Sequence, residues 1–433
     1  MSSIVNTGLF LDSQKHTFSS SPMIGNFCTC DVENYGDLLY PIIFKHMMLS
    51  RQFTGEIKPF GFLDGRAPAK AGYEVDSIFN LLSEHSDRLD ALVVGGGDII
   101  RTDKDVLASH YESLYRQRMQ KNPLYGIRKR LFGETDLTKN FVHKFMGYRS
   151  IGPLILNARD YPAIGLVAYC SCGVPFEFKE EERSAVANAF NNASFIYVRD
   201  HQSAEKLKRA GVTQKIEVAP DLIVTLSDFY DRSAERERGR QILESYGVDT
   251  SRRVLGLQCA PQSASNYAEI VKQITQYSRQ AECDVALIPI GYCHEDDKAL
   301  KRLAAVSNGA FKYVGVRAVQ DMVSVLAACD TFLGTSMHAN ITAFSFGIPH
   351  LVGPLAVDKL GGFLDITGLD PAIRLNTWSE VAARLQWVQE LGTSHFEDKA
   401  DIAKKAVHKT FDQLTHAISP RLHSAANERT ATC

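Results

Sequence analysis

The sequence predicts an α/β protein made of two Rossmann-like domains that face each other across a cleft and are followed by C-terminal helices. Strand and helix patterns alternate from residue 23 to residue 230, and the alternation restarts between residues 250 and 375. A polar, charged segment at residues 233–240 separates the two arrays. The chain has 433 residues, a length that accommodates about two domains.

The first array follows a lead-in at residues 1–22 that we expect to be disordered. Short apolar runs predict its strands, and longer periodic runs predict its helices. The expected strands are residues 23–27, 90–95, 163–168, 195–199 and 215–219, and the expected helices are residues 38–49, 179–190 and 200–210. The alternation breaks between residues 101 and 160, which we interpret as a basic insertion in this N-terminal domain of residues 23–230.

The insertion combines cations with apolar and aromatic residues. The cations are Arg116, Arg118, Lys121, Arg128, Lys129 and Arg130, and Leu124, Tyr125, Leu131 and Phe132 lie among them. Such a segment is typical either of a solvated helix face or of peripheral contact with an anionic membrane surface. We favour the solvated face and keep membrane contact through residues 116–132 as the alternative.

The second array, residues 250–375, repeats the same pattern. Its expected strands are residues 253–258, 284–289, 331–334 and 349–352, and its expected helices are residues 267–281, 296–306 and 319–328. The C-terminal helices occupy residues 377–418. Thr377 and Glu380 form a capping box before a helix at residues 381–391, and a second helix follows at residues 399–418. We expect residues 424–433 to be a loose tail.

Composition places the chain among ordinary globular proteins, with 45% hydrophobic and 23% charged residues. The net charge of −2 argues against a dedicated nucleic-acid-binding protein. No apolar run reaches the length of a membrane span, and the N-terminus lacks the basic flank and apolar core of a secretory signal. We therefore expect a cytoplasmic protein, with peripheral contact at the inner membrane face as a further option.

Nine scattered cysteines, most of them in apolar contexts, are typical of free thiols in a reducing compartment. Two pairs, Cys28 with Cys30 and Cys170 with Cys172, have C-x-C spacing at strand ends. Zinc sites usually use C-x₂₋₄-C spacing, which neither pair matches. We interpret the pairs as small buried residues, with a metal or disulfide role as the less favoured alternative.

The most informative segment is residues 334–353, which has the pattern of a strand end, a turn, a helix, a glycine stop and the next strand. His338 falls in the first turn of that helix, beyond the carboxyl end of a strand, where ligands bind in α/β sheets. The helix N-terminus offers free N–H groups to an anion, and a histidine beside it can carry a proton at neutral pH. His338 is therefore either a catalytic acid or base, or a residue that caps the helix and packs under the turn.

Two further strand ends carry residues that suit an anionic ligand. Gly95-Gly-Gly-Asp98 follows a buried strand, so that Gly96 and Gly97 let a phosphate or sugar approach the backbone, although tight packing also requires glycine. The turn is not G-x-G-x-x-G, which disfavours a nicotinamide dehydrogenase. Arg199 ends another strand and either grips a carboxylate or phosphate, or pairs with Asp200 or Glu205. Asp200 has the position of an N-cap.

Three more residues follow strands that end at the predicted cleft. Lys359 lies after the last strand, and Asn34 and Asp37 occupy the turn after the first. The two turn residues either contact an acceptor sugar or shape the turn, and we favour the turn. The aspartates at positions 37, 98 and 221 lack two-metal spacing, so we expect neither a metal nor a cofactor.

The ordered set of motifs resembles the polysaccharide pyruvyl transferase family. The motifs are N-Y-G-D at residues 34–37, V-V-G-G-G-D at 93–98, Y-V-R-D-x-x-S at 197–203, A-P-D at 219–221 and the His-helix-G-I-P block at 338–349. The resemblance spans residues 24–369. It implies a fold similar to GT-B glycosyltransferases and transfer of the pyruvyl group of phosphoenolpyruvate onto two sugar hydroxyls, with release of phosphate.

The resemblance also implies roles for residues. His338 would be catalytic, and Arg199 and Lys359 would bind the donor, phosphoenolpyruvate, as a co-substrate. Many members have an arginine where this chain has Ser336, which would bring a hydroxyl to the donor in place of a charge. We also predict donor contacts from Gly96 and Gly97, and contacts from Asn34, Asp37 and Asp98 to a sugar or lipid-linked oligosaccharide acceptor in exopolysaccharide biosynthesis.

Two alternatives remain open. A nucleotide-sugar glycosyltransferase of GT-B fold would need an acidic residue near the end of the late helix to hold a ribose, and this chain offers Ser345 there. A non-catalytic member would bind a glycan or a phosphorylated metabolite without converting it. Ser336 favours that second alternative, whereas the joint presence of Arg199, His338 and Lys359 opposes it.

Overall fold

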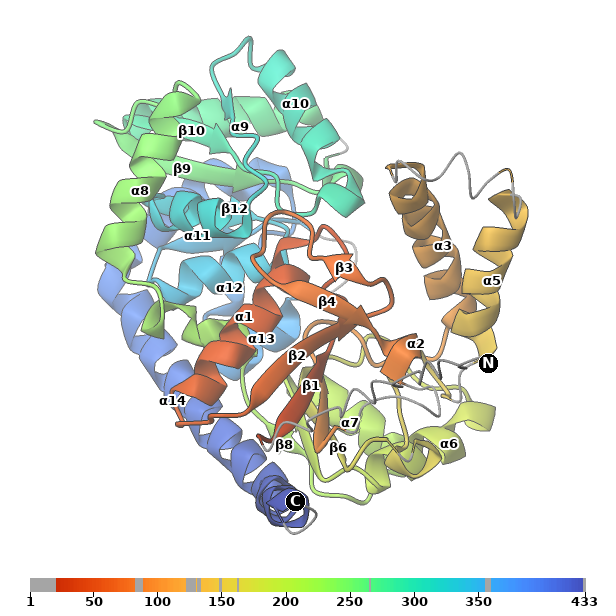
Figure 1. Cartoon of the computed structure of the whole chain (residues 1–433). Coiled ribbons are helices and arrows are strands. Elements are labelled where there is room, and N and C mark those ends of the chain that lie inside the picture. The colour runs from red at the N-terminus through yellow and green to blue at the C-terminus, as the bar shows by residue number, and fades with distance from the viewer. Residues whose placement is uncertain are drawn as a thin grey trace, which may run out of the picture.

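The computed structural model describes residues 21–81, 89–121, 130, 134–147, 150–161, 163–264, 266–354 and 360–430. Within these residues the strands form two sheets, one of eight strands in the order β3-β4-β2-β1-β5-β6-β7-β8 and one of five in the order β11-β10-β9-β12-β13. Figure 1 shows each sheet in its own domain, with helices on both sides. The two sheets with their helices form two Rossmann-like domains, which matches the predicted fold class.

The N-terminal sheet is parallel except for its edge pair, β3 with β4. Its strands are β1 (Met23–Phe27), β2 (Glu56–Gly61), β3 (Gly65–Arg66), β4 (Glu74–Ser77), β5 (Ala91–Gly95), β6 (Val167–Cys172), β7 (Phe195–Val198) and β8 (Glu217–Val218). The central strands β5 and β6 are buried along their whole length, as the continuous apolar runs predict. All parallel strands end at one edge, where the candidate site lies.

The C-terminal sheet is wholly parallel among its described strands. Its strands are β9 (Arg253–Gln258), β10 (Cys283–Leu287), β11 (Lys312–Tyr313), β12 (Thr331–Gly334) and β13 (His350–Val352). The connecting helices are α8 (Arg232–Ser245), α9 (Tyr267–Gln280), α10 (Asp296–Val306), α11 (Val319–Ala327), α12 (Met337–Ser345) and α13 (Gly361–Thr367), with the short turn η4 (Tyr292–His294) before α10.

The helices of the N-terminal domain are α1 (Tyr35–Leu49), α2 (Ile78–Leu81), α3 (Lys104–Lys121), α5 (Glu134–Gly147), α6 (Glu180–Asn191) and α7 (His201–Arg209), followed by η2 (Leu222–Asp228). Asp200 caps α7 as predicted, because its carboxylate accepts from the Ser203 N–H at 2.6 Å. Four described strands, β2, β3, β4 and β11, had no counterpart in the sequence prediction. Pro59 and Gly61 interrupt the pattern of β2, since neither residue favours a strand interior.

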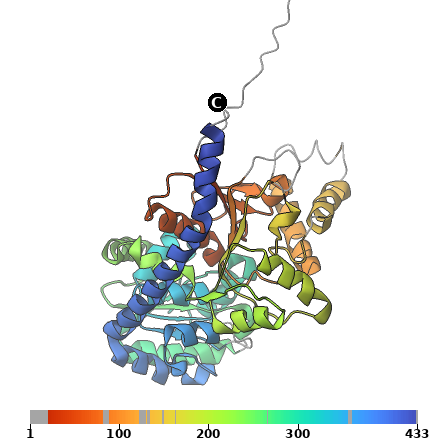
Figure 2. The same ribbon diagram turned by 90° about the horizontal axis from the view of Figure 1, so that it is seen from below.

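The end of the chain differs from the expectation of two helices and a loose tail. A helical run, α14 (Val381–Thr430), is interrupted at Gly392, whose φ of 76° and ψ of 165° are not helical. Residues 424–430 are therefore helical rather than loose, and residues 431–433 lie outside the described part. Figure 2 shows α14 crossing the molecule and projecting past it, and the helix contacts both sheets on the way.

The insertion contributes the helix pair α3 and α5, which pack together on the flank of the N-terminal domain (Figure 1). Tyr111 anchors α3 by donating from its hydroxyl to Asp31 Oδ1 at 2.7 Å. Arg116 forms an ion pair with Glu112 at 2.7 Å, as on a solvated helix face. Most of the segment proposed for membrane contact, residues 122–129 and 131–133, lies outside the described residues. No helix among the described residues combines the length and apolarity needed to cross a membrane.

The two C-x-C pairs are buried free thiols, as favoured from the sequence. All four cysteines are at most 1% exposed. Burial raises the pKa of the Cys170 thiol to about 12, so this side chain stays protonated at neutral pH. The thiols therefore fill space behind the candidate site as small apolar groups.

Candidate active site

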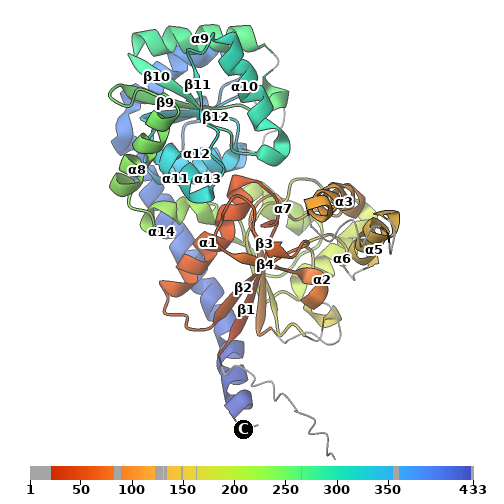
Figure 3. The same cartoon turned by 45° about the horizontal axis from the view of Figure 1, so that its top comes forward.

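The candidate site lies where the carboxyl edges of the two sheets meet, between the N-termini of α1 and α12. Figure 3 shows these two helices between the domains. The Tyr35 hydroxyl is 2.9 Å from Thr342 Oγ1 of the other domain, and the Tyr35 N–H donates to the Ile290 carbonyl at 3.3 Å. These contacts hold the N-terminal part of α1 against the C-terminal domain. The carboxyl ends of the strands, where the two domains meet, are the position at which α/β proteins bind ligands.

His338 occupies the first turn of α12, just after β12, as the sequence predicts. Its ring packs on the backbone of Gly36, because a Cβ built on that glycine would lie 1.8 Å from His338 Nδ1. Position 36 therefore requires a glycine, because the His338 ring of the other domain fills the space that a side chain would occupy. The imidazole is partly exposed, so it remains accessible to a ligand.

Asp37 follows Gly36 in α1 and interacts electrostatically with His338. Burial raises the pKa of the Asp37 carboxyl, and His338, the Asn34 amide and His294 partly offset this rise. Asn34 Nδ2 donates to Asp37 Oδ2 at 2.8 Å. Asn34 therefore orients Asp37, in line with its interpretation as a turn residue. Asp37 also interacts electrostatically with His338 of the other domain.

The N-terminus of α12 is partly occupied by the protein itself. Gln258 Oε1, at the end of β9, accepts from the Thr335 and Ser336 N–H groups at 2.8 and 2.7 Å. The Ser336 hydroxyl caps the helix by accepting from the Ala339 N–H at 3.5 Å. Among the described residues, no acceptor faces the Met337 and His338 N–H groups. The anion-binding site predicted at this helix N-terminus is thus reduced to the Met337 and His338 N–H groups.

The triple-glycine turn packs against α1 and leads to Asp98. Gly96 and Gly97 have φ of +80° and +79°, which glycine adopts without strain. A Cβ on Gly95 would lie 1.8 Å from the Tyr40 hydroxyl, and one on Gly97 would lie 3.3 Å from Asp37 Oδ1. Close packing against Tyr40 therefore explains the glycine at position 95. Gly97 instead places the backbone close to the Asp37 carboxylate.

Arg199 follows β7, and its side chain is 4% exposed. The guanidinium pairs with Asp98 and, at 3.4 Å, with Asp221. Burial lowers the pKa of Arg199, but the two carboxylates outweigh burial and leave the pKa raised. The expected alternative partners are wrong, because Asp200 caps α7 and Glu205 pairs with Lys208 at 2.8 Å. Two carboxylates thus already pair with Arg199, one of the two cations predicted to bind the donor.

Lys359 lies outside the described residues, which resume at Leu360. The segment after it starts α13, where a Cβ on Gly362 would be 2.9 Å from Asp200 Cβ. The start of α13 thus lies next to the residue that follows Arg199. Lys359 remains a prediction.

Four residues of this region escaped the sequence analysis as site residues. They are Gln258, Asp221, Gly173 and His294. A Cβ on Gly173 would lie 2.4 Å from Asp98 Oδ1, so this glycine makes room for the Arg199 ion pair. Each of the four follows or ends a strand, and that position was the signal available in the sequence.

No group of three or more histidine, cysteine, aspartate or glutamate side chains in the described part of the chain is arranged to hold a metal ion. The expectation of metal-free catalysis stays a prediction. The site offers the partly exposed His338, the neighbouring Asp37 carboxyl, two backbone N–H donors and Arg199, a buried cation that is already paired with two carboxylates. This set suits proton transfer next to an anionic group.

Comparisons with known proteins identify the family and the fold. The family model for polysaccharide pyruvyl transferase matches residues 34–352. No curated protein matches the chain. Among solved structures, UDP-GlcNAc 2-epimerase from Neisseria meningitidis, bound to UDP-GlcNAc, is 10% identical with a TM-score of 0.52, covering 92% of this chain and all of that one.

Two other structures are similar to the same degree. The Anabaena protein HepE, in complex with UDP and glucose, is 12% identical with a TM-score of 0.52, covering 92% of this chain and all of that one. UDP-GlcNAc 2-epimerase from Methanocaldococcus jannaschii is 13% identical with a TM-score of 0.51, covering 91% of this chain and 99% of that one. These likenesses establish a GT-B-like fold.

Proposed function

The chain belongs to the polysaccharide pyruvyl transferase family, and we propose that it moves the pyruvyl group of phosphoenolpyruvate onto two hydroxyls of a sugar. The sugar belongs to a polysaccharide or its lipid-linked precursor, and the product is a cyclic ketal plus inorganic phosphate. The observation that carries this proposal is the position of His338 between the domains, where its ring packs on Gly36 and interacts electrostatically with Asp37. It provides a proton carrier beside free helix N–H groups.

His338 transfers the first proton. As an imidazolium it protonates the methylene carbon of phosphoenolpyruvate, which makes the adjacent carbon electrophilic. A sugar hydroxyl attacks that carbon, and its proton returns to His338. The bond between that carbon and the phosphate oxygen then breaks, the second hydroxyl forms the second C–O bond, and its proton leaves with the phosphate. Asp37 stabilises the imidazolium, and such acid–base catalysis is worth about 10² to 10⁴ in rate.

Arg199 binds the donor when an anionic group of the donor replaces one of the two carboxylates that pair with the guanidinium. Asp98 is 27% exposed and sits on the flexible-backbone glycine turn, whereas Asp221 is 2% exposed. Asp98 is therefore the partner that a donor carboxylate or phosphate displaces, while Asp221 keeps the guanidinium oriented. The Met337 and His338 N–H groups and Lys359 bind the remaining negative charge, and the Ser336 hydroxyl donates where many family members have an arginine.

Calorimetric titration of the purified chain with phosphoenolpyruvate tests the proposal, with UDP-sugars titrated in parallel. Arg199→Ala should abolish binding, and Arg209→Ala is the matched control because Arg209 pairs with Glu177 on the surface of the same domain. Circular dichroism checks that Arg199→Ala is folded. Binding of a UDP-sugar without any response to phosphoenolpyruvate would overturn the donor assignment in favour of a glycosyltransferase.

A second variant keeps the test decisive if Arg199→Ala does not fold. Asp98→Asn preserves the shape of the turn but removes the carboxylate that competes with the donor. We expect Asp98→Asn to bind phosphoenolpyruvate more tightly than the wild type. Equal or weaker binding would contradict the exchange at Arg199.

A further inference from the structure

A second hollow lies on the C-terminal domain, at the edge of its sheet opposite the candidate active site. It has a volume of about 930 Å³ and is lined by the starts of β9 and β10, the end of α9 and one face of α14. β9 runs from Arg253 in this hollow to Gln258 at the active site, a span of roughly 17 Å for six residues of strand. The hollow is therefore separate from the site of the proposed reaction.

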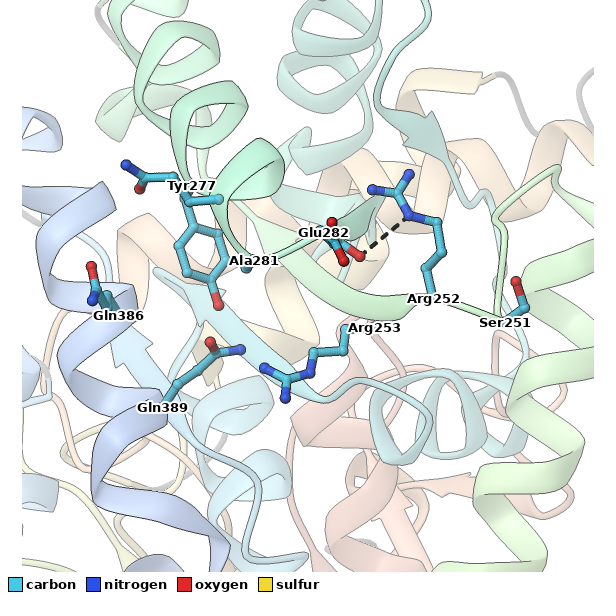
Figure 4. A pocket seen from close by; sticks show the side chains of 9 residues that line it. Ser251, Arg252, Arg253, Tyr277, Ala281, Glu282, Gln386 and Gln389 are labelled. Carbon is cyan, nitrogen blue, oxygen red and sulfur yellow. Dashed lines mark hydrogen bonds between the residues drawn. The ribbon is translucent and has the colours of Figure 1, made fainter.

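Three polar groups converge in this hollow. Figure 4 shows the Arg253 guanidinium, the Tyr277 hydroxyl and the Gln389 amide pointing toward one another. Tyr277 is 2% exposed, and its hydroxyl forms no hydrogen bond of normal geometry among the described residues, although the Thr331 side chain lies close to it. The nearby Thr331 hydroxyl instead accepts from Gln389 Nε2 at 3.0 Å. An unsatisfied buried hydroxyl costs free energy, so a group that pairs with it from the hollow would stabilise the protein.

The two arginines of the hollow differ in their partners. Arg252 donates from Nε to the Glu282 carbonyl at 3.2 Å and pairs with Asp284 at 3.1 Å. Figure 4 shows it turned toward Glu282 and away from Arg253. No carboxylate within the described ranges pairs with Arg253, which is exposed to the hollow. The guanidinium of Arg253 thus keeps its donors free for a planar or tetrahedral anion.

We propose that this hollow binds a small hydroxyl-bearing molecule through a phosphate or carboxylate group held by Arg253. The Tyr277 hydroxyl donates a second hydrogen bond to the same anionic group. The Gln389 carbonyl oxygen accepts from a ligand hydroxyl, because the amide nitrogen is already engaged with Thr331. The volume exceeds that of an inorganic anion and falls in the range of about 300–1,000 Å³ that small-molecule sites occupy.

The test is calorimetric titration of the full chain with three probes, namely inorganic phosphate, glucose 6-phosphate and citrate. Arg253→Ala should weaken binding of the preferred probe at least tenfold. Arg302→Ala is the matched control, because it removes one exposed cation from the same domain and the side chain lies over the Tyr267 ring at 4.6 Å. Tyr277→Phe should also weaken binding while leaving the unfolding transition in place, since its hydroxyl has no hydrogen bond of normal geometry to lose among the described residues.

The choice among probes identifies the anionic group, as phosphate or as carboxylate. Phosphoenolpyruvate binding at the active site should be the same in Arg253→Ala and in the wild type. The proposal is overturned if none of the probes binds saturably. It is also overturned if Arg253→Ala and Tyr277→Phe bind all three probes as the wild type does, because the anion would then occupy another part of the chain.

Discussion

The two domains present different kinds of groups to the candidate active site. The N-terminal domain offers a cation, Arg199, that is buried and already paired with Asp98 and Asp221. The C-terminal domain offers His338, which is partly exposed, and two helix N–H groups without an acceptor among the described residues. A satisfied buried charge contributes first to stability, whereas an unsatisfied, accessible group is free to act on a ligand. The comparison predicts that substitutions on the two sides have different consequences.

The largest expected effect is on turnover, from His338→Ala. We expect the rate to fall by about 10² to 10⁴, the usual worth of a general acid–base residue. Donor affinity should change less than tenfold, and the unfolding midpoint should stay close to that of the wild type. Phosphate release from phosphoenolpyruvate in the presence of an acceptor measures the rate. A variant with normal turnover would remove His338 from the chemistry.

Arg199→Ala should lower the free energy of unfolding in addition to abolishing donor binding. It leaves the Asp221 carboxylate, 2% exposed, without its cation, and breaking such a buried pair costs about 3–5 kcal/mol. Urea unfolding measures the loss. Arg209→Ala, whose pair with Glu177 is exposed on both sides, should cost less than about 1 kcal/mol. Equal losses in the two variants would mean that the Arg199 cluster is not a stability element.

A buried histidine of the C-terminal domain contrasts with His338. Burial lowers the pKa of His350 from 6.5 to about 4, and its Nδ1 lies 2.9 Å from the Ile348 carbonyl. In the unfolded chain His350 binds a proton below about pH 6.5, whereas in the folded chain it binds one only below about pH 4. The contribution of His350 to the free energy of unfolding is therefore constant above pH 6.5 and falls by about 3 kcal/mol as the pH drops to 4.

His350→Phe should flatten this pH dependence, because phenylalanine does not titrate. The measurement is the free energy of unfolding from pH 7.5 to pH 4.5 in both proteins. Parallel curves would show that His350 does not contribute to acid destabilisation.

The smallest expected effect comes from Gly36→Ala. The added methyl group would overlap His338 Nδ1 at 1.8 Å, so the ring must move, and overpacking of this kind costs about 1–3 kcal/mol. Turnover should fall together with stability, because the displaced ring loses its position beside Asp37. Gly147→Ala is the control, since a Cβ there meets no atom within 4 Å. An active Gly36→Ala variant would argue that His338 tolerates displacement.

Local features of the site could be read from the sequence. His338 lies in the first turn of a helix after a strand, Asp200 caps α7, and the glycine turn follows β5, as each short pattern predicts. These features depend on neighbours within about four residues, through capping bonds and backbone freedom. The break between the C-terminal helices was likewise predictable, because Gly392 interrupts α14 where the first helix was expected to end.

The partners of these residues were decided by the tertiary structure. The alternative to ligand binding by Arg199 was an ion pair with a sequence neighbour, Asp200 or Glu205, but Arg199 pairs with residues 101 and 22 positions away. The free N–H groups expected beside His338 are reduced because Gln258, 77 and 78 residues before Thr335 and Ser336, accepts from the N–H groups of both. Short patterns do not specify such partners, since the order of strands in the sheet determines which strand ends lie side by side.

The sequence by itself therefore determined the α/β class, the two arrays and the identity of the chemically capable residues at strand ends. The tertiary structure decided which of these residues meet. It placed His338 on Gly36 and beside Asp37 of the other domain, and it enclosed Arg199 between two carboxylates. The physical reason is that strand and helix patterns arise from local periodicity, whereas the charge state and accessibility of a side chain depend on every element packed against it.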